Sequence, residues 1–229
     1  MTSPCDGCET SRCCIVFDPE LTCADLHRLC RARGLAPENV ATIAPVRADE
    51  AGPDAIRFDD TPCAWELRLA RTRTARGNGG RRRCQFLVDL GLEAAPGEPA
   101  RQVNRCGVYQ DRPMMCRLYP SDKTPFGLMV GSPRRVCPPG AWSALKADVP
   151  GLLATHARAD AERALHRLFL ARWNACIVRT LSGPATAARA LFFACVMRVH
   201  DALAAAPGAD PLAAIDACFL PLERADLRA

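Results

Sequence analysis

Neither secretion nor membrane insertion is indicated by this sequence, because the long apolar segments that both require are missing. The chain begins Met-Thr-Ser-Pro-Cys and has no basic segment followed by an apolar one, as a signal peptide would have. Its longest uninterrupted apolar run, Leu191 to Met197, is too short to cross a bilayer. We therefore expect a cytoplasmic protein with no membrane partner.

The common catalytic and nucleotide-binding patterns are also missing. No Cys-His dyad, Ser-His-Asp set, phosphate-binding glycine loop or carboxylate pair stands out by its spacing. No helical pattern follows Gly77-Asn78-Gly79-Gly80, so this run predicts a hairpin turn and not a dinucleotide site. Acid–base catalysis by Tyr109 or Asp111 is conceivable only from their nearness to cysteines. Whether the protein is an enzyme is therefore an open question at this level.

Positive charge is concentrated in one segment. The net charge of the chain is only +5, yet residues 68–83 contain seven arginines and no acidic residue. Aromatic residues do not alternate with these arginines, as they would in a surface that stacks on bases. A solvated hairpin tip that blocks edge-to-edge strand pairing therefore explains the patch better than a nucleic-acid site. The patch consists of Arg68, Arg71, Arg73, Arg76, Arg81, Arg82 and Arg83.

Cysteine, in contrast, is abundant, with 14 in the chain. Where thiols stay reduced, clustered cysteines bind metals more often than they form disulfides. We interpret Cys23, Cys30, Cys176, Cys195 and Cys218 as small core residues of helices, and we set Cys63 aside. The remaining eight fall in predicted loops or at the edges of strands and turns: Cys5, Cys8, Cys13, Cys14, Cys84, Cys106, Cys116 and Cys137.

These eight cysteines match two four-thiolate sites, or one site with accessory thiols. Four thiolates complete one tetrahedral zinc site or hold one iron–sulfur cluster. The side chains of the neighbours Cys13 and Cys14 diverge, so they serve two irons or two sites more easily than one zinc ion. Arg105, Arg112 and Arg117 would offset the negative charge of a cluster and its thiolates. An iron–sulfur site is therefore favoured over zinc, and the partition of the thiols stays open.

The periodicity of the sequence predicts an α+β fold. We expect residues 1–140 to form a small cysteine-rich metal-binding domain with short antiparallel strands, and residues 141–229 an alanine-rich helical bundle. The N-terminal residues 1–17 are expected to be a loop, and a helix is expected from Asp18–Pro19 to Gly34. Helices are further predicted at about 153–181, 185–205 and 211–219, between proline- and glycine-containing breaks.

Strands are predicted from alternating apolar residues. Residues 65–69 alternate, and residues 84–90 are expected to return as the second strand of a hairpin. Residues 91–104 are expected to be a flexible connection. Cys106 then opens a short apolar run with Val108 and Tyr109 that suits a strand end, and a helical turn over 113–119 carries Cys116, because proline suits the first turn of a helix.

Five pieces of the sequence, taken in order, carry a resemblance to a known family. They are Cys5-x-x-Cys8-x-x-x-x-Cys13-Cys14, Leu21-Thr22-x-x-Asp25-Leu26-x-Arg28-Leu29, Cys84-Gln85-Phe86-Leu87, Cys106-Gly107-Val108-Tyr109-x-x-Arg112-Pro113-x-x-Cys116-Arg117-x-Tyr119-Pro120, and Cys137-Pro138. With these pieces the chain resembles the YkgJ-type cysteine-cluster family, the CxxCxxCC zinc- or iron-chelating proteins, which is similar to part of the flagellin lysine-N-methylases.

The resemblance covers roughly residues 5–140 and implies that the eight cysteines are the metal ligands. The chain departs from the common pattern in three places. Four residues instead of two precede the Cys13-Cys14 pair, Gln85 replaces a proline, and the connection over 91–104 is longer than usual. The first departure alters the loop that carries the first thiols, and so bears on which of them share a metal.

Three functions follow as expectations. The first is a cytoplasmic protein with one or two iron–sulfur clusters, of the 4Fe-4S type, that performs redox chemistry or a cluster-dependent modification of a protein or peptide. The second is a structural zinc module without catalysis. The third, implied by the methylase resemblance, is an enzyme that methylates protein lysines with S-adenosylmethionine. A protein or peptide is the expected partner in the catalytic cases, and nucleic acid is not expected.

Overall fold

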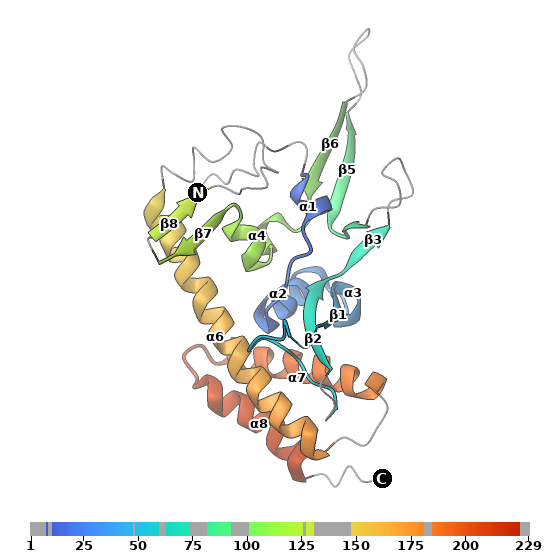
Figure 1. Cartoon of the computed structure of the whole chain (residues 1–229), viewed down its shortest axis with the longest axis vertical. Helices are drawn as coiled ribbons and strands as arrows, with labels where there is room; N and C mark the ends of the chain where they lie inside the picture. Colours follow the sequence, from blue (N-terminus) through green and yellow to red (C-terminus); the bar gives the residue numbers. More distant parts are fainter. Residues whose placement is uncertain are drawn as a thin grey trace. The chain divides into compact units, whose positions relative to one another are not determined.

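The computed structural model describes most of the chain (Figure 1), namely residues 8, 11–47, 49–59, 63–73, 82–92, 101–125, 127–130, 148–180 and 185–224. It confirms the expected mixture of helices and short antiparallel strands with a C-terminal helical region. The chain forms two compact units, each built from two stretches of sequence. Unit 1 comprises Met1–Pro19 and Leu69–Ala159, and unit 2 comprises Glu20–Arg68 and Asp160–Ala229.

The change in composition near residue 140 did not indicate this interleaved division. The expected boundary between residues 140 and 141 lies outside the described residues, so the proposed domains 1–140 and 141–229 stay a prediction.

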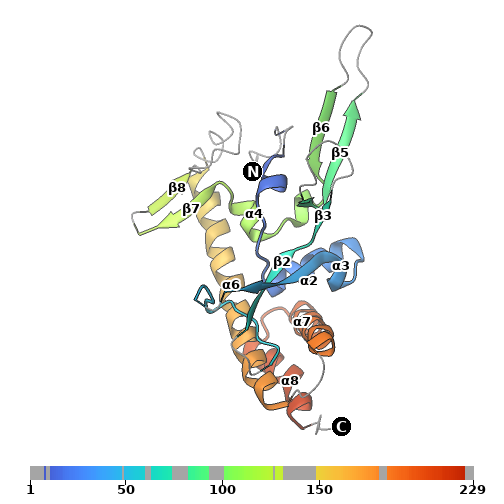
Figure 2. The ribbon, with the colours of Figure 1, turned by 45° about the vertical axis from the view of Figure 1, so that its right-hand side comes forward.

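Unit 1 contains short elements. Its described part includes three two-stranded antiparallel sheets. The elements are α1 (Cys13–Val16), β3 (Arg71–Arg73), β4 (Arg82–Cys84), β5 (Leu87–Leu92), β6 (Arg101–Cys106), the 3-10 turn η1 (Tyr109–Asp111), α4 (Met114–Leu118), β7 (Ser121–Thr124) and β8 (Gly127–Val130). Figure 2 shows β5–β6 and β7–β8 as separate ribbons of paired strands.

The predicted return strand at residues 84–90 was wrong in its bounds and in its partner strand. Cys84 ends β4, which pairs with β3, and a turn at Gln85-Phe86 separates it from β5. β5 pairs instead with β6 over six residues, because the neighbouring stretch 101–106 satisfies the backbone hydrogen bonds of β5. The expected flexible connection was therefore also wrong at both ends, and residues 93–100 lie outside the described part.

A glycine allows the β5–β6 hairpin to close beside Cys106. The Gly107 N–H donates to the Phe86 carbonyl at 2.7 Å. A side chain at Gly107 would stand 3.0 Å from both the Phe86 carbonyl oxygen and a methyl carbon of Val88. The end of β6 therefore approaches the β4–β5 turn closely because residue 107 has no side chain.

Unit 2 contains longer helices. Its elements are α2 (Cys23–Arg33), α3 (Pro37–Val40), β1 (Ala41–Val46), the greater part of β2 (Ala64–Leu69), α6 (Val149–Thr180) from Asp160 onward, α7 (Ala185–Ala205) and α8 (Pro211–Arg224). The three predicted C-terminal helices are confirmed. α6 begins earlier than expected because Pro150 lies in its first turn, where proline is tolerated. No helix of the described chain has the length and apolarity needed to cross a membrane.

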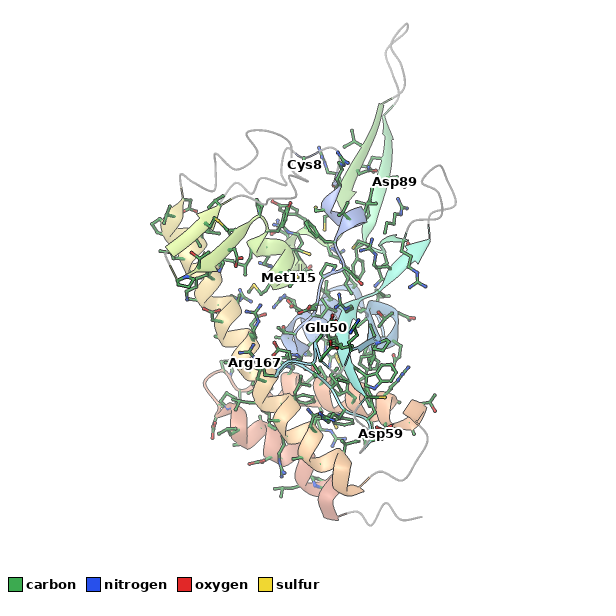
Figure 3. The ribbon with its side chains drawn as sticks, in the orientation of Figure 1. Cys8, Glu50, Asp59, Asp89, Met115 and Arg167 are labelled. Carbon is green, nitrogen blue, oxygen red and sulfur yellow. The ribbon has the colours of Figure 1, made fainter. Side chains whose placement is uncertain are left out.

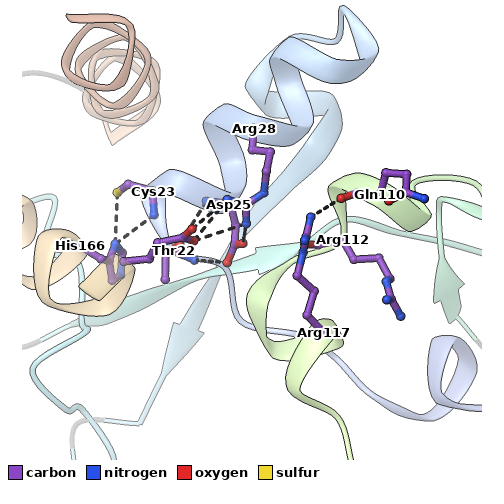
Figure 4. A network of polar contacts seen from close by, with 9 residues as sticks. Thr22, Cys23, Asp25, Arg28, Gln110, Arg112, Arg117 and His166 are labelled. Atoms are coloured by element: carbon purple, nitrogen blue, oxygen red, sulfur yellow. Dashed lines mark hydrogen bonds and ion pairs between the residues drawn. The ribbon is translucent and has the colours of Figure 1, made fainter. Parts of the chain in front are cut away.

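The predicted start of α2 at Asp18–Pro19 was wrong, whereas its end at Gly34 is confirmed by a left-handed φ of 62°. The Leu21 N–H donates to the Leu67 carbonyl at 2.8 Å, so this stretch is extended along β2. Thr22 then caps the helix. Its hydroxyl accepts from the Asp25 N–H, and its own N–H donates to the Asp25 carboxylate, both at 3.1 Å (Figure 4).

The core of unit 2 is aromatic and includes thiols. Phe192 is fully buried, and its ring centroid lies 5.9 Å from that of Phe58, 5.8 Å from Phe169 and 5.2 Å from Trp173. Edge-to-face pairs of this kind stabilise a core beyond the area they bury. The five helical cysteines expected in the core are all buried: Cys23, Cys30, Cys176, Cys195 and Cys218.

Candidate metal centre

One pocket of about 400 Å³ in unit 1 is lined by six of the eight cysteines predicted as ligands. Five separate segments supply them. Cys8 comes from the N-terminal segment, Cys13 and Cys14 from α1, Cys84 from the end of β4, Cys106 from the end of β6 and Cys116 from α4. Cys84 is buried and the other five are half-buried. The remaining two, Cys5 and Cys137, lie outside the described residues.

The Cys13-Cys14 pair lies on a short helical turn and not, as expected, in a loop. The Cys14 N–H donates to the Ser11 carbonyl and the Phe17 N–H to the Cys13 carbonyl, both at 2.9 Å. Ser11 also ties the turn to β6, because its hydroxyl donates to the Asn104 carbonyl at 3.0 Å. The turn that carries two thiols is thereby attached to the strand that ends in a third.

One thiol contacts two others. The Cys14 thiol is hydrogen-bonded to those of Cys13 and Cys84. The hydrogen bond from Cys14 lowers the pKa of Cys13 to about 7 and also lowers the pKa of Cys84. The pKa of Cys14 itself is raised, because it holds the shared proton and is buried. Cys14 therefore lies between two thiols that ionise readily.

Arg71 joins the segments that carry these thiols. Its guanidinium donates to the carbonyl of Ile15 at 2.6 Å and to those of Phe17 and Arg82. Its charge contributes to the lowered pKa of Cys84. Sequence reasoning missed this role, because Arg71 belongs to an arginine-rich segment that was interpreted as a solvated hairpin tip. No sequence signal distinguishes it from the other arginines of that segment.

Two other arginines of the patch form ion pairs with acidic side chains. Arg68 pairs with Glu66, and Arg83 pairs with Asp89. Asp89 lies on β5 and is labelled in Figure 3. Residues 74–81 lie outside the described part. The expectation of a solvated tip thus stays a prediction for the tip itself.

Of the three arginines expected to surround the site, Arg105 and Arg112 line the pocket. Arg105 also donates to the Cys8 carbonyl. The guanidinium of Arg112 lies 4.0 Å from the centre of the Tyr109 ring, and its Nε donates to the Tyr109 carbonyl at 3.0 Å. Both cations are therefore held in place by the segments that supply thiols.

Arg117 has a different role from the one expected. It donates through Nε to the Arg112 carbonyl at 2.8 Å and through its terminal nitrogen to the Gln110 carbonyl (Figure 4). These bonds fix the turn between η1 and α4. Arg117 is not among the residues that line the pocket, so it acts through the turn that places Cys116.

Apolar side chains complete the pocket. The rings of Phe17 and Tyr119 pack with their centroids 4.7 Å apart, and both line it together with Leu69, Val108 and Met115, which is labelled in Figure 3. Low-dielectric surroundings of this kind strengthen the interaction of thiolates with a bound cation.

The thiols are near one another but are not arranged as ligands. In the part of the chain that the structure describes, which includes neither Cys5 nor Cys137, no group of three or more His, Cys, Asp and Glu side chains is placed to hold a metal ion. The donor set nevertheless fits an iron–sulfur cluster in kind and number, since four thiolates suffice and six line the pocket.

Comparison of the chain with protein-family models, curated proteins and solved structures finds no match. The geometry of the thiol pocket is therefore the basis for any functional conclusion.

Proposed function

We propose that the protein is a cytoplasmic iron–sulfur protein of the YkgJ type, whose cluster is bound by cysteines of the thiol pocket. The observation that carries this proposal is that five separate segments bring six cysteines to one pocket. A chance distribution of core thiols would scatter them, as apolar residues are scattered through a core. The candidate ligands are the six described cysteines together with Cys5 and Cys137.

Two features favour a cluster over a single zinc ion. Zinc in structural sites is enclosed by four ligands and leaves no space beside it, whereas the pocket has a volume of about 400 Å³. Cys13 and Cys14 are also adjacent in sequence and both line the pocket. Two irons of one cluster accommodate neighbouring thiolates more easily than one zinc ion does.

The common pocket also favours one site over two. Because six of the eight cysteines line it, a second four-thiolate site elsewhere would have at most two of them as ligands. We therefore propose one cluster, with the thiols beyond four as accessory groups.

The residues of the chain have distinct roles in this proposal. Arg105 and Arg112 offset the negative charge of the thiolates. Phe17 and Tyr119 exclude water from the site. When bound, an iron–sulfur cluster supplies one-electron redox chemistry. A protein or peptide is the proposed partner of that chemistry.

A structural zinc module is the second candidate. The hydrogen bonds that link Cys14 to Cys13 and to Cys84 favour it, because they group three of the four thiols that one zinc ion would need. In that case the metal stabilises unit 1 and performs no reaction.

Metal and acid-labile sulfide analysis of the full chain, purified without oxygen, separates the two candidates. The cluster predicts a brown protein that contains iron and sulfide in similar amounts and absorbs visible light. A colourless protein that holds zinc and no sulfide would contradict the cluster and support the zinc module. A protein with neither metal would contradict both.

A further inference from the structure

Arg71 contacts the backbone of both segments that carry the three contacting thiols. Ile15 and Phe17, whose carbonyls accept from Arg71, belong to the segment that begins with Cys13 and Cys14. The third acceptor is the carbonyl of Arg82. One planar guanidinium thus spans two chain segments with a fixed fork of donors, which lysine lacks because its donors share one nitrogen.

The segments that Arg71 joins are too short to hold their own positions. α1 has four residues, and the β3–β4 ladder has three residue pairs. Isolated helices and two-stranded ribbons of that length are not stable in water. Arg71 stands opposite Cys84 in the ladder, so its side chain starts beside one thiol and its contacts end beside the other two.

Hydrogen bonds from a charged donor stabilise a structure more than neutral ones. The three carbonyls that accept from Arg71 are therefore bound more strongly than the neighbouring backbone contacts, such as the Gln85 N–H to the Ala70 carbonyl at 3.4 Å. Removing the guanidinium would leave the α1 segment attached to β4 by the contact of Cys14 with Cys84 and by packing.

We propose that Arg71 is a positioning residue of the thiol pocket, which holds the Cys13-Cys14 turn against the strand that ends in Cys84. The inference rests on the proposed function for the identity of the metal that these thiols bind. The arrangement of the thiols itself is a property of the chain. Arg71 thereby determines whether the three thiols act as one group.

The test compares the full-length protein with three variants, all purified without oxygen and then treated with the same iron chelator, because a bound cluster would protect all of its cysteine ligands together. Arg71→Gln removes both the charge and the fork of donors. Arg71→Lys keeps the charge but has a single nitrogen. Arg83→Gln removes an equal charge from β4, where Arg83 pairs with Asp89, and is the matched control. Alkylation with iodoacetamide, followed by peptide mass spectrometry, gives the reaction rate of each cysteine separately.

Both Arg71 variants should alkylate about ten-fold faster at Cys13, Cys14 and Cys84, since loss of charge-assisted hydrogen bonds shifts a local opening equilibrium by that order. The rates at Cys106 and Cys116 in the same samples should stay at the wild-type values. Arg83→Gln should match the wild type throughout. If Arg71→Lys also reacts faster than the wild type, the positive charge alone is not sufficient and the planar set of donors is required.

Three outcomes would overturn the inference. Wild-type rates in both Arg71 variants would mean that the contacts hold nothing in place. Full restoration by lysine would reduce the role to charge. Equal acceleration of every cysteine in unit 1, including Cys106 and Cys116, would make Arg71 a general support of the fold. Iron and sulfide are measured in the wild-type protein before the chelator is added, so their absence would refute the cluster without affecting the rates on which the inference depends.

Discussion

The cysteines of unit 1 and unit 2 differ in the elements that carry them. In unit 1 they lie on turns, strand ends and helices of four or five residues, and five of the six described are half-buried. In unit 2 the five helical cysteines lie on α2, α6, α7 and α8 and are all buried. A long helix with an apolar stripe places a thiol among hydrophobic side chains, whereas a short turn presents it to a pocket.

The buried thiols of unit 2 also interact, but within the core. The Cys218 thiol donates to the Cys195 carbonyl at 3.9 Å. Cys23 is fully buried, and its pKa is raised because burial disfavours the thiolate. The Cys23 N–H donates to Nδ1 of His166 at 3.2 Å. The thiols of Cys195 and Cys218 are also hydrogen-bonded to each other, so contact between thiols is insufficient to indicate a metal site. The cysteines of unit 1 are distinguished by the number of them that line one pocket.

The largest expected difference between the two units is in metal binding, after substitution of a single cysteine. Cys84→Ala should remove most of the metal, since structural metal–thiolate binding contributes on the order of 10 kcal/mol that the ligands share. Cys176→Ala, the matched change in the core of unit 2, should retain it. Metal content per chain measures both. If both variants retain the same amount of metal, the cysteines of unit 1 are no more involved in metal binding than those of unit 2.

A core substitution in unit 2 should have the next largest effect. Phe192→Ala removes a fully buried ring that contacts Phe58, Phe169 and Trp173. Substitutions of this kind cost about 3–5 kcal/mol in free energy of unfolding, through lost burial and the cavity that remains. Urea titration followed by tryptophan fluorescence measures the loss. A change well below that range would show that the aromatic cluster is not the core of unit 2.

Acid should destabilise unit 2 through its buried histidines. Burial lowers the pKa of His166 from 6.5 to about 4, so the unfolded chain binds a proton that the folded chain does not bind as the pH falls between these values. Stability should therefore be full above pH 6.5 and decrease toward pH 4, by about 3 kcal/mol for this residue.

Replacement His166→Gln keeps an acceptor for the Cys23 N–H and removes the titration. Urea titrations at pH 7 and pH 4.5 should give a smaller difference for this variant than for the wild type. An unchanged difference would assign the acid sensitivity to other groups, such as His200, whose pKa burial also lowers to about 4.

The smallest expected effect concerns the start of α2. Thr22→Ala removes the hydroxyl that accepts from the Asp25 N–H, which should cost about 1 kcal/mol in free energy of unfolding. Thr22→Ser retains the cap and serves as the control. Loss of stability in the alanine variant, with unchanged metal content, would show that the helix of unit 2 is stabilised by its cap and not by the pocket of unit 1.

The sequence predicted the long helices and the buried cysteines on them, because a period of 3.6 residues persists over several turns. It did not predict the start of α2, because the extended pairing of Leu21 with Leu67 depends on a partner far along the chain. The pairing of β5 with β6 was missed for the same reason.

The candidate cysteines of the site could be named from the sequence, since they lie outside the long predicted helices that carry five of the other cysteines. Their partners could not. The contact of Cys14 with Cys84 depends on how short elements pack. Helices and strands of three or four residues are too short to show a hydrophobic periodicity in the sequence. Arg71 was missed because its partners are backbone carbonyls. Every residue has a backbone carbonyl, so the sequence does not show which of them accept a hydrogen bond from an arginine.

The difference between the two units is tested most directly by a map of thiol protection before and after metal removal. The full chain is purified without oxygen and alkylated, with and without prior treatment by a strong iron chelator, and each cysteine is quantified by mass spectrometry. The account predicts that chelation exposes at least four of the unit 1 cysteines, while Cys23, Cys176 and Cys195 stay protected by the fold. An identical map with and without the chelator would contradict it.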